Sequence, residues 1–170
     1  MVGGSRRNIY SHFGGKQGLF IEVVTRLCDE NARPIEELNI ADSDVTTALT
    51  LFGRHTLEIV LRPRVLALHR LMVAEGGRFP ELAQAIWRSG HDRATRILAK
   101  WMTTRSAELR LHGDAQILAG QFIELLVTRG QLEALVGLHP QPYTSEEITR
   151  VVDVAVSTFV HGIQKERNQP

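Results

Sequence analysis

The apolar side chains of this sequence recur at three- and four-residue steps from near its beginning to near its end, and this spacing constrains the fold more than any other feature. Segment 143–165 shows it most clearly. Its apolar residues are Ile148, Val151, Val152, Ala155, Val156, Phe159, Val160 and Ile163. Alternation at every second residue, which is typical of strands, extends over no more than three or four positions. The spacing therefore predicts an all-α fold.

Capping and helix-breaking residues indicate where the helices begin and end. Thr144 and Glu147 have the spacing of a capping box, and Asp114 is placed to cap the preceding helix. Pro80 suits the first position of a helix, whereas Gly90 on its apolar stripe indicates close packing or a kink. The expected helices span about residues 6–13, 16–31, 44–61, 63–75, 80–107, 114–137 and 143–165.

Length and composition limit the class of protein. The 170 residues suit one core with a small appendage, and 20 Lys and Arg against 19 Asp and Glu exclude a generally polybasic chain. Cys28 is the only cysteine, which rules out an internal disulfide and fits a reducing compartment. No apolar run approaches the ~20 residues that span a bilayer. We expect a soluble cytoplasmic protein without a membrane partner.

The first sixteen residues differ from the rest because they are basic and no acidic residue precedes Glu22. Between two Gly-Gly turns they predict a short helix that exposes cationic and amide side chains. Such a helix suits the DNA major groove, where Arg reads guanine, Asn reads adenine, and Tyr, His and Lys hold phosphates. Solvated surface charge is the alternative interpretation. The candidate DNA-binding residues are Arg6, Arg7, Asn8, Tyr10, His12 and Lys16.

The same segment carries a family signature. From Gly4 to Phe20 the chain reads Gly-Ser-Arg-Arg-Asn-Ile-Tyr-Ser-His-Phe-Gly-Gly-Lys-Gln-Gly-Leu-Phe. This resembles the recognition-helix signature of the TetR/AcrR family of bacterial transcription regulators. Residues 68–90 are similar to the C-terminal ligand and dimer domain of one subgroup. The resemblance implies a TetR-like regulator, with part of a DNA-binding helix-turn-helix domain at 1–31 and a ligand-binding and dimerisation domain at 44–165.

In that family two further helices precede the recognition helix, whereas only four residues precede Ser5 here. A helix of about eight residues is too short to be stable alone. We therefore expect an incomplete N-terminal domain, with a recognition helix at about 5–13 and impaired operator binding by this chain.

A homodimer is expected from the helix at 114–137. Its apolar sector is wider than one stripe, because Ile123, Val127 and Leu135 widen the face that carries Phe122. A helix of this kind is usually buried on two sides, and the second side can be covered by another subunit. The resemblance also implies that the last two helices pair across a two-fold axis.

Polar side chains on apolar stripes indicate a candidate ligand pocket. His55, His69 and Arg129 lie on or beside such stripes, and buried polar groups need partners. Arg129 either forms a buried salt bridge, to Glu58, Glu75 or Glu124, or snorkels, or it anchors the polar group of a ligand. Aromatic and methionine side chains would then form the walls, although they are also typical of a plain core. These side chains are Phe52, Met72, Trp87, Trp101 and Phe122.

The sequence contains none of the usual catalytic or metal-binding patterns. None of the seven histidines stands near a second ligand at zinc-site spacing, and there is neither a Gly-rich phosphate loop nor a Ser elbow. We expect no metal, no cofactor and no enzymatic activity. The preferred function is a ligand-responsive repressor that a small, largely apolar effector releases from operator DNA. The alternative is a helical homodimer that binds small molecules or a protein partner but no DNA.

An electrophoretic mobility shift at low salt distinguishes these two functions. We expect the 170-residue chain to bind a short palindromic duplex poorly, and an N-terminally extended chain to bind it specifically. In the extended chain, Arg7→Ala and Asn8→Ala should relax specificity by about 1–3 kcal/mol per base contact, whereas Lys16→Ala should weaken binding to all duplexes alike. Tight, specific binding by the 170-residue chain would contradict the expectation.

Overall fold

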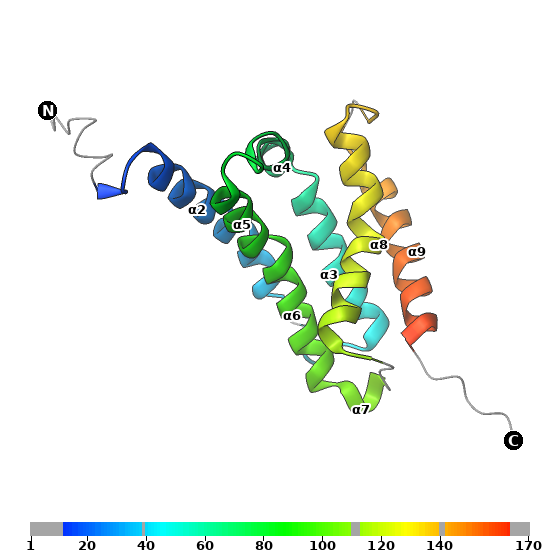
Figure 1. Ribbon diagram of the computed structural model, residues 1–170. Coiled ribbons are helices and arrows are strands. Elements are labelled where there is room, and N and C mark those ends of the chain that lie inside the picture. The colour runs from blue at the N-terminus through cyan, green and yellow to red at the C-terminus, as the bar shows by residue number, and fades with distance from the viewer. Residues whose placement is uncertain (1–11, 39, 110–112, 140–141, 164–170) are drawn as a thin grey trace, which may run out of the picture.

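The computed structural model describes residues 12–38, 40–109, 113–139 and 142–163, and within these ranges all regular structure is helical (Figure 1). The all-α prediction is confirmed. The helices are α2 (Lys16–Glu36), α3 (Val45–Val60), α4 (Pro63–Glu75), α5 (Pro80–Ser89), α6 (His91–Thr104), α7 (Ser106–Leu109), α8 (Ala115–Leu135) and α9 (Ser145–Ile163).

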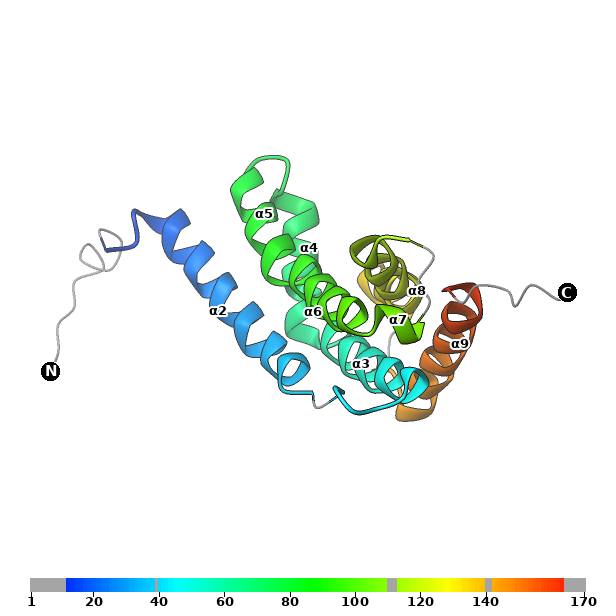
Figure 2. The same cartoon turned by 90° about the horizontal axis from the view of Figure 1, so that it is seen from below.

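The main core lies between α3, α6, α8 and α9. Helix α8 packs mainly on α6, and α3 packs mainly on α9. Phe122 of α8 and Phe159 of α9 meet with ring centroids 5.0 Å apart. Helices α2 and α9 lie at opposite sides of the molecule in both views (Figures 1 and 2). The fully buried side chains include Leu49, Phe52, Leu98, Met102, Phe122, Leu126 and Val152.

A smaller apolar cluster attaches α2 to the rest of the chain. Val24 and Cys28 of α2 pack with Leu82 and Ile86 of α5, apart from the main core. An ionic contact adds to it. Arg93 of α6 donates from Nε to Glu36 Oε1 at 2.9 Å and from Nη1 to the carboxylate of Asp29. Because both carboxylates belong to α2, the guanidinium of Arg93 links α2 to α6.

Several local predictions are confirmed. The capping box is present: the backbone N–H of Thr144 donates to Glu147 Oε2 at 2.8 Å, and the N–H of Glu147 donates to Thr144 Oγ1 at 3.2 Å. Asp114 accepts from the N–H groups of Gln116 and Ile117 at 2.8 and 3.1 Å, as its position predicted. These side chains satisfy backbone donors that a helix start leaves without an intrahelical partner.

The turn before α2 is also as expected. Gly14 and Gly15 have φ values of 70° and 106°, which favour glycine. Gly18 has a further reason to be glycine, because a Cβ there would lie 1.6 Å from the backbone oxygen of Phe13. The turn is therefore tightly packed on the first turn of α2, and the chain entering α2 has a defined direction.

Helix α2 is longer than predicted, since it continues from residue 31 to Glu36 through Pro34. Proline lacks an N–H and therefore removes one intrahelical hydrogen bond, and here it lies near the C-terminal end of α2. The extension buries Ile35 in the main core. The burial of the apolar Ile35 side chain offsets the loss of the hydrogen bond that Pro34 cannot make.

The segment predicted as helical at 80–107, with close packing or a kink at Gly90, is divided at that residue into α5 and α6. Gly90 has ψ −95°, outside the helical range, and α6 ends at Thr104 before the short α7. Helix α5 packs on α2 and α4, whereas α6 packs on α8. The bend lets one continuous apolar stripe face two different neighbours.

Candidate functional site

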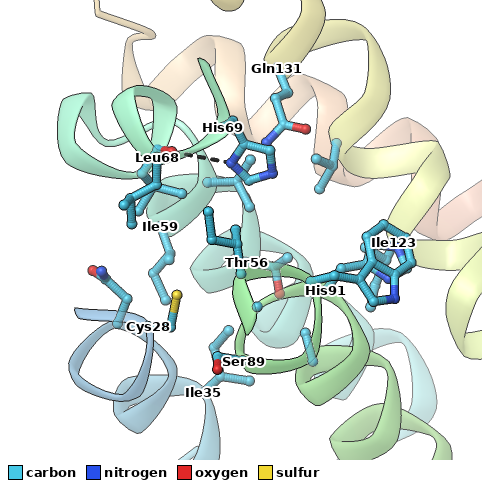
Figure 3. A pocket seen from close by; sticks show the side chains of 18 of the residues that line it. Cys28, Ile35, Thr56, Ile59, Leu68, His69, Ser89, His91, Ile123 and Gln131 are labelled. Atoms are coloured by element: carbon cyan, nitrogen blue, oxygen red, sulfur yellow. Dashed lines mark hydrogen bonds between the residues drawn. The ribbon is translucent and has the colours of Figure 1, made fainter. Parts of the chain in front are cut away.

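A cavity of about 110 Å³ lies between α2, α3, α4, the α5–α6 bend and α8 (Figure 3). Its walls are largely apolar. They are formed by Ile35, Ile59, Val60, Val65, Leu68, Met72, Ile86, Ala94, Ile97, Ile123 and Val127. The remaining lining residues are Cys28, Asn31, Thr56, His69, Trp87, Ser89, Gly90, His91 and Gln131. Among the residues that the structure describes, the lining contains no Asp, Glu, Lys or Arg. We call this cavity the pocket.

His69 of α4 presents a hydrogen-bond acceptor to the pocket. Its Nδ1 lies 3.1 Å from the backbone oxygen of Val65, and a carbonyl can only accept, so Nδ1 carries the proton. In the neutral ring Nε2 is then an acceptor. Burial lowers the pKa of His69, and the nearby ring of His91 lowers that pKa further against the effect of the Val65 bond. The imidazole is therefore neutral at neutral pH.

Two other side chains carry buried polar atoms without partners. Within the part of the chain that the structure describes, neither Thr56 Oγ1 nor Gln131 Nε2 has a hydrogen-bond partner. Both residues line the pocket, and Figure 3 shows Thr56, His69 and Gln131 converging on its interior from α3, α4 and α8. A buried polar group without a hydrogen bond is costly, so such groups point to a function.

The outer wall of the pocket is aromatic. The rings of Trp87 and His91 are stacked, with centroids 4.3 Å apart and planes 17° apart, and Trp87 remains 50% exposed. His91 Nε2 lies 3.0 Å from Glu124 Oε1 on α8. This contact connects the α5–α6 bend to α8.

The side chains that α2 contributes to the pocket are not reactive. Burial raises the pKa of the Cys28 thiol, so it is protonated and weakly nucleophilic. Asn31 donates to the backbone oxygen of Leu27 at 2.7 Å and accepts from Arg62 at 3.0 Å. These two side chains form part of the wall, whereas the buried polar atoms without partners belong to Thr56 and Gln131.

The structure brings three of the predicted ligand residues to the pocket, namely His69, Met72 and Trp87. The others lie elsewhere. Phe52 and Phe122 are buried in the main core, and Trp101 donates to the backbone oxygen of Ile40 at 3.2 Å.

His55 and Arg129 also lie away from the pocket lining. His55 Nδ1 contacts the backbone oxygen of Leu51 at 3.0 Å. The Arg129 side chain is 89% exposed and pairs with Glu133 at 2.9 Å. The expectation that Arg129 is a buried or snorkelling group is therefore wrong, because its face of α8 is turned to solvent.

Thr56, Gln131 and His91 were not among the sequence candidates. For Thr56 a signal was available, since this polar residue occupies the same apolar stripe of α3 as Phe52 and Ile59. Gln131 and His91 carry no comparable signal. Their role arises from helices that are distant in sequence.

Of the candidate DNA-binding residues, Arg6, Arg7, Asn8 and Tyr10 lie outside the described residues. His12 is exposed with its ring against Phe13 at 4.8 Å, and Lys16 is the first residue of α2. In the described ranges no three His, Cys, Asp or Glu side chains gather in a way that could hold a metal ion. No helix there is both long and apolar enough for a bilayer.

The comparisons with known proteins agree with this architecture. Residues 47–162, more than half of the chain, match the family described as AefR-like transcriptional repressor, C-terminal domain. The chain belongs to the TetR family of transcriptional regulators. The TetR/AcrR resemblance is thereby confirmed, and the protein is a regulator rather than an enzyme.

Two solved structures show the same TetR fold. The Flavonoid-responsive Regulator FrrA is 27% identical with a TM-score of 0.79, and the match covers 96% of this chain and 82% of FrrA. A protein of Mesorhizobium loti MAFF303099 described as a TetR-family transcriptional regulator is 24% identical with a TM-score of 0.83, over 94% and 81% of the two chains. No curated protein matches this TetR-family chain significantly.

The lowered pKa of His69 predicts a pH dependence of stability. In the unfolded chain this histidine protonates near its ordinary pKa of about 6.5, whereas in the folded chain it stays neutral to lower pH. The free energy of unfolding should therefore fall as the pH drops below about 6.5, down to the folded pKa. In His69→Phe this fall should be smaller, as measured by urea unfolding across the pH range.

The control is His161→Gln, which changes an exposed histidine of α9. It should leave the pH profile as in the wild type. An unchanged profile in His69→Phe would contradict the assignment of a buried neutral imidazole.

Proposed function

We propose that this TetR-family chain is a ligand-responsive repressor that acts in the cytoplasm as a homodimer. With a complete N-terminal domain it binds operator DNA and releases it when a small, largely apolar effector enters the pocket, whereas we expect impaired operator binding by the 170-residue chain itself. In this proposal residues 1–31 belong to the DNA-binding part and residues 44–165 form the ligand-binding and dimerisation part. The observation that carries the proposal is that one wall of the pocket is α2, the helix that directly follows the DNA-reading segment.

The position of α2 supports a transmission mechanism. Cys28, Asn31 and Ile35 of α2 line the pocket, while the opposite walls belong to α3, α4, α6 and α8. An effector larger than the cavity of about 110 Å³ has to displace a wall. Helix α2 is the wall that is held by the smaller cluster and by Arg93 rather than by the main core alone. Displacement of α2 by the effector would shift the protein toward a second conformation.

A movement of α2 would reach the DNA through the turn at Gly14 and Gly15. The candidate DNA-reading residues precede this turn: Arg6, Arg7 and Asn8 for base edges, and Tyr10 and His12 for phosphates. Lys16, after the turn, is the third phosphate contact. A change in the separation of two such segments in a dimer weakens binding to an operator with fixed half-site spacing.

Exposed apolar side chains on α8 and α9 support dimerisation. On α8 the residues Ile117, Leu125 and Leu132 are each more than half exposed, as are Val136 directly after this helix and Val154 on α9. Beside them runs a groove lined by Leu118, Gln121, Glu124, Leu125, Thr158, Phe159 and Gly162. Several large apolar side chains left exposed on neighbouring helices mark an interaction surface, and a two-fold pairing of α8 and α9 would cover them.

The effector is tested in cells with a transcriptional reporter for the promoter of the chain's own gene. Because FrrA is a flavonoid-responsive regulator, the first compound is the flavonoid naringenin. Deleting the gene should raise transcription, and naringenin should raise transcription only when the gene is present. Ala94→Phe, which fills the pocket from α6, should keep repression but abolish the response.

Ala67→Phe, on the exposed face of α4, is the matched control and should respond like the wild type. Lower transcription after deletion would contradict a repressor. No effect of deletion would instead favour the binding module without DNA contact. A response that survives in Ala94→Phe would overturn the pocket as the effector site.

The dimer is tested by sedimentation velocity at micromolar concentration. Leu125→Arg places a charge in the groove on α8 and should convert the dimer to a monomer, because a buried unpaired charge is strongly unfavourable at an interface. Val73→Arg is the control, since Val73 is also exposed but lies on α4. A monomeric wild type, or a Leu125→Arg protein that stays dimeric, would contradict the proposed interface.

A further inference from the structure

We infer that the pocket is built for an uncharged, single-ring aromatic compound that carries both a hydroxyl group and a carbonyl group. This inference rests on the proposed function, namely that the pocket holds the effector. It goes further in naming the chemical class, which follows from the size, charge and hydrogen-bonding groups of the pocket.

The size of the pocket favours one ring. A dry apolar cavity of about 150 Å³ accommodates benzene. The present cavity of about 110 Å³ is somewhat smaller, so a single substituted ring is enough to fill it and to press on one of its walls. The stacked rings of Trp87 and His91 form one of the walls, and a planar aromatic ligand matches such a surface better than a flexible chain does.

The charge of the lining favours a neutral ligand. Among the described residues that line the pocket there is no Lys, Arg, Asp or Glu, and His69 is neutral. His91 is the other ionisable ring at the wall, and its Nε2 already faces Glu124. A carboxylate or an ammonium group would therefore be buried without a counter-ion, which is strongly unfavourable.

The polar groups of the pocket specify the functional groups of the ligand. His69 Nε2 accepts a hydrogen bond, so it calls for a hydroxyl donor. Gln131 Nε2 is a hydrogen-bond donor without a partner among the described residues, so a carbonyl oxygen of the ligand can accept from it. Thr56 Oγ1 is buried and unpaired, and it can serve either group. A ligand with one hydroxyl and one carbonyl offers a donor to His69 Nε2. It also offers partners to Thr56 Oγ1 and Gln131 Nε2, which have none among the described residues.

The test is isothermal titration calorimetry of the purified chain with four compounds of similar size at about pH 7, where His69 is neutral. We expect 4-hydroxyacetophenone to bind. Its relatives 4-methoxyacetophenone, without the hydroxyl donor, and 4-ethylphenol, without the carbonyl, should bind about tenfold more weakly, since each loses one hydrogen bond to the pocket. The anion 4-hydroxybenzoate should bind about a hundredfold more weakly or not at all.

Two variants test the residues themselves through two independent measurements. Thr56→Val and Gln131→Met each remove an unpaired buried polar group, so each should raise the melting temperature of the ligand-free protein. Each should also weaken 4-hydroxyacetophenone binding about tenfold. The matched control is Thr95→Val: Thr95 is also buried but donates to the backbone oxygen of His91 at 2.9 Å. Its change should not raise the melting temperature or alter affinity for the ligand.

The outcomes distinguish this inference from the proposed function. Equal affinities for the four compounds, or unchanged affinity in Thr56→Val and Gln131→Met, would overturn the chemical class. Lower melting temperatures in both variants would show that these groups stabilise the empty protein, which would also overturn it. If naringenin raises transcription through the pocket while 4-hydroxyacetophenone does not bind, the proposed function stands and the single-ring inference fails.

Discussion

The structure depends on α8, a helix that is apolar on almost every side. Within the chain it packs against α3, α4, α6 and α9, and it buries Ala119, Phe122 and Leu126 in the main core. Its remaining apolar stripe, which includes Ile117 and Leu125, is exposed. Because no single core can cover such a helix, the same sequence property both organises the fold and leaves the exposed surface where we propose that a second subunit packs.

The pocket results from two levels of packing. Helices α3, α6, α8 and α9 form a dense core, whereas α2 is held by the small cluster around Val24 and Cys28 and by the contacts of Arg93. The cavity lies where these two regions meet, and polar groups without partners face into it. A core selected only for stability would have filled this space with apolar side chains and left no unsatisfied polar group. The packing defect and the unsatisfied polar groups therefore lie at the place where we propose that the effector binds.

Much of the fold was predictable because its signals are local. The caps at Asp114 and Thr144, the proline that begins α5 and the glycine turn before α2 act within a few residues along the chain. Two details went beyond the prediction because they depend on distant partners. The break at Gly90 follows from the different neighbours of α5 and α6, and the continuation of α2 past Pro34 follows from the burial of Ile35.

By itself, the sequence determined the all-α class, most helix bounds, the excess of apolar surface on α8 and the resemblance to TetR regulators. Only the tertiary structure decided which polar side chains face the pocket. His55 and Thr56 are neighbours on α3, yet Thr56 lines the pocket and His55 does not. The physical reason is geometric: consecutive helical residues point about 100° apart. Periodicity identifies an apolar face, but the packing of distant helices decides which residues at its edge become buried and which, like Arg129, remain in solvent.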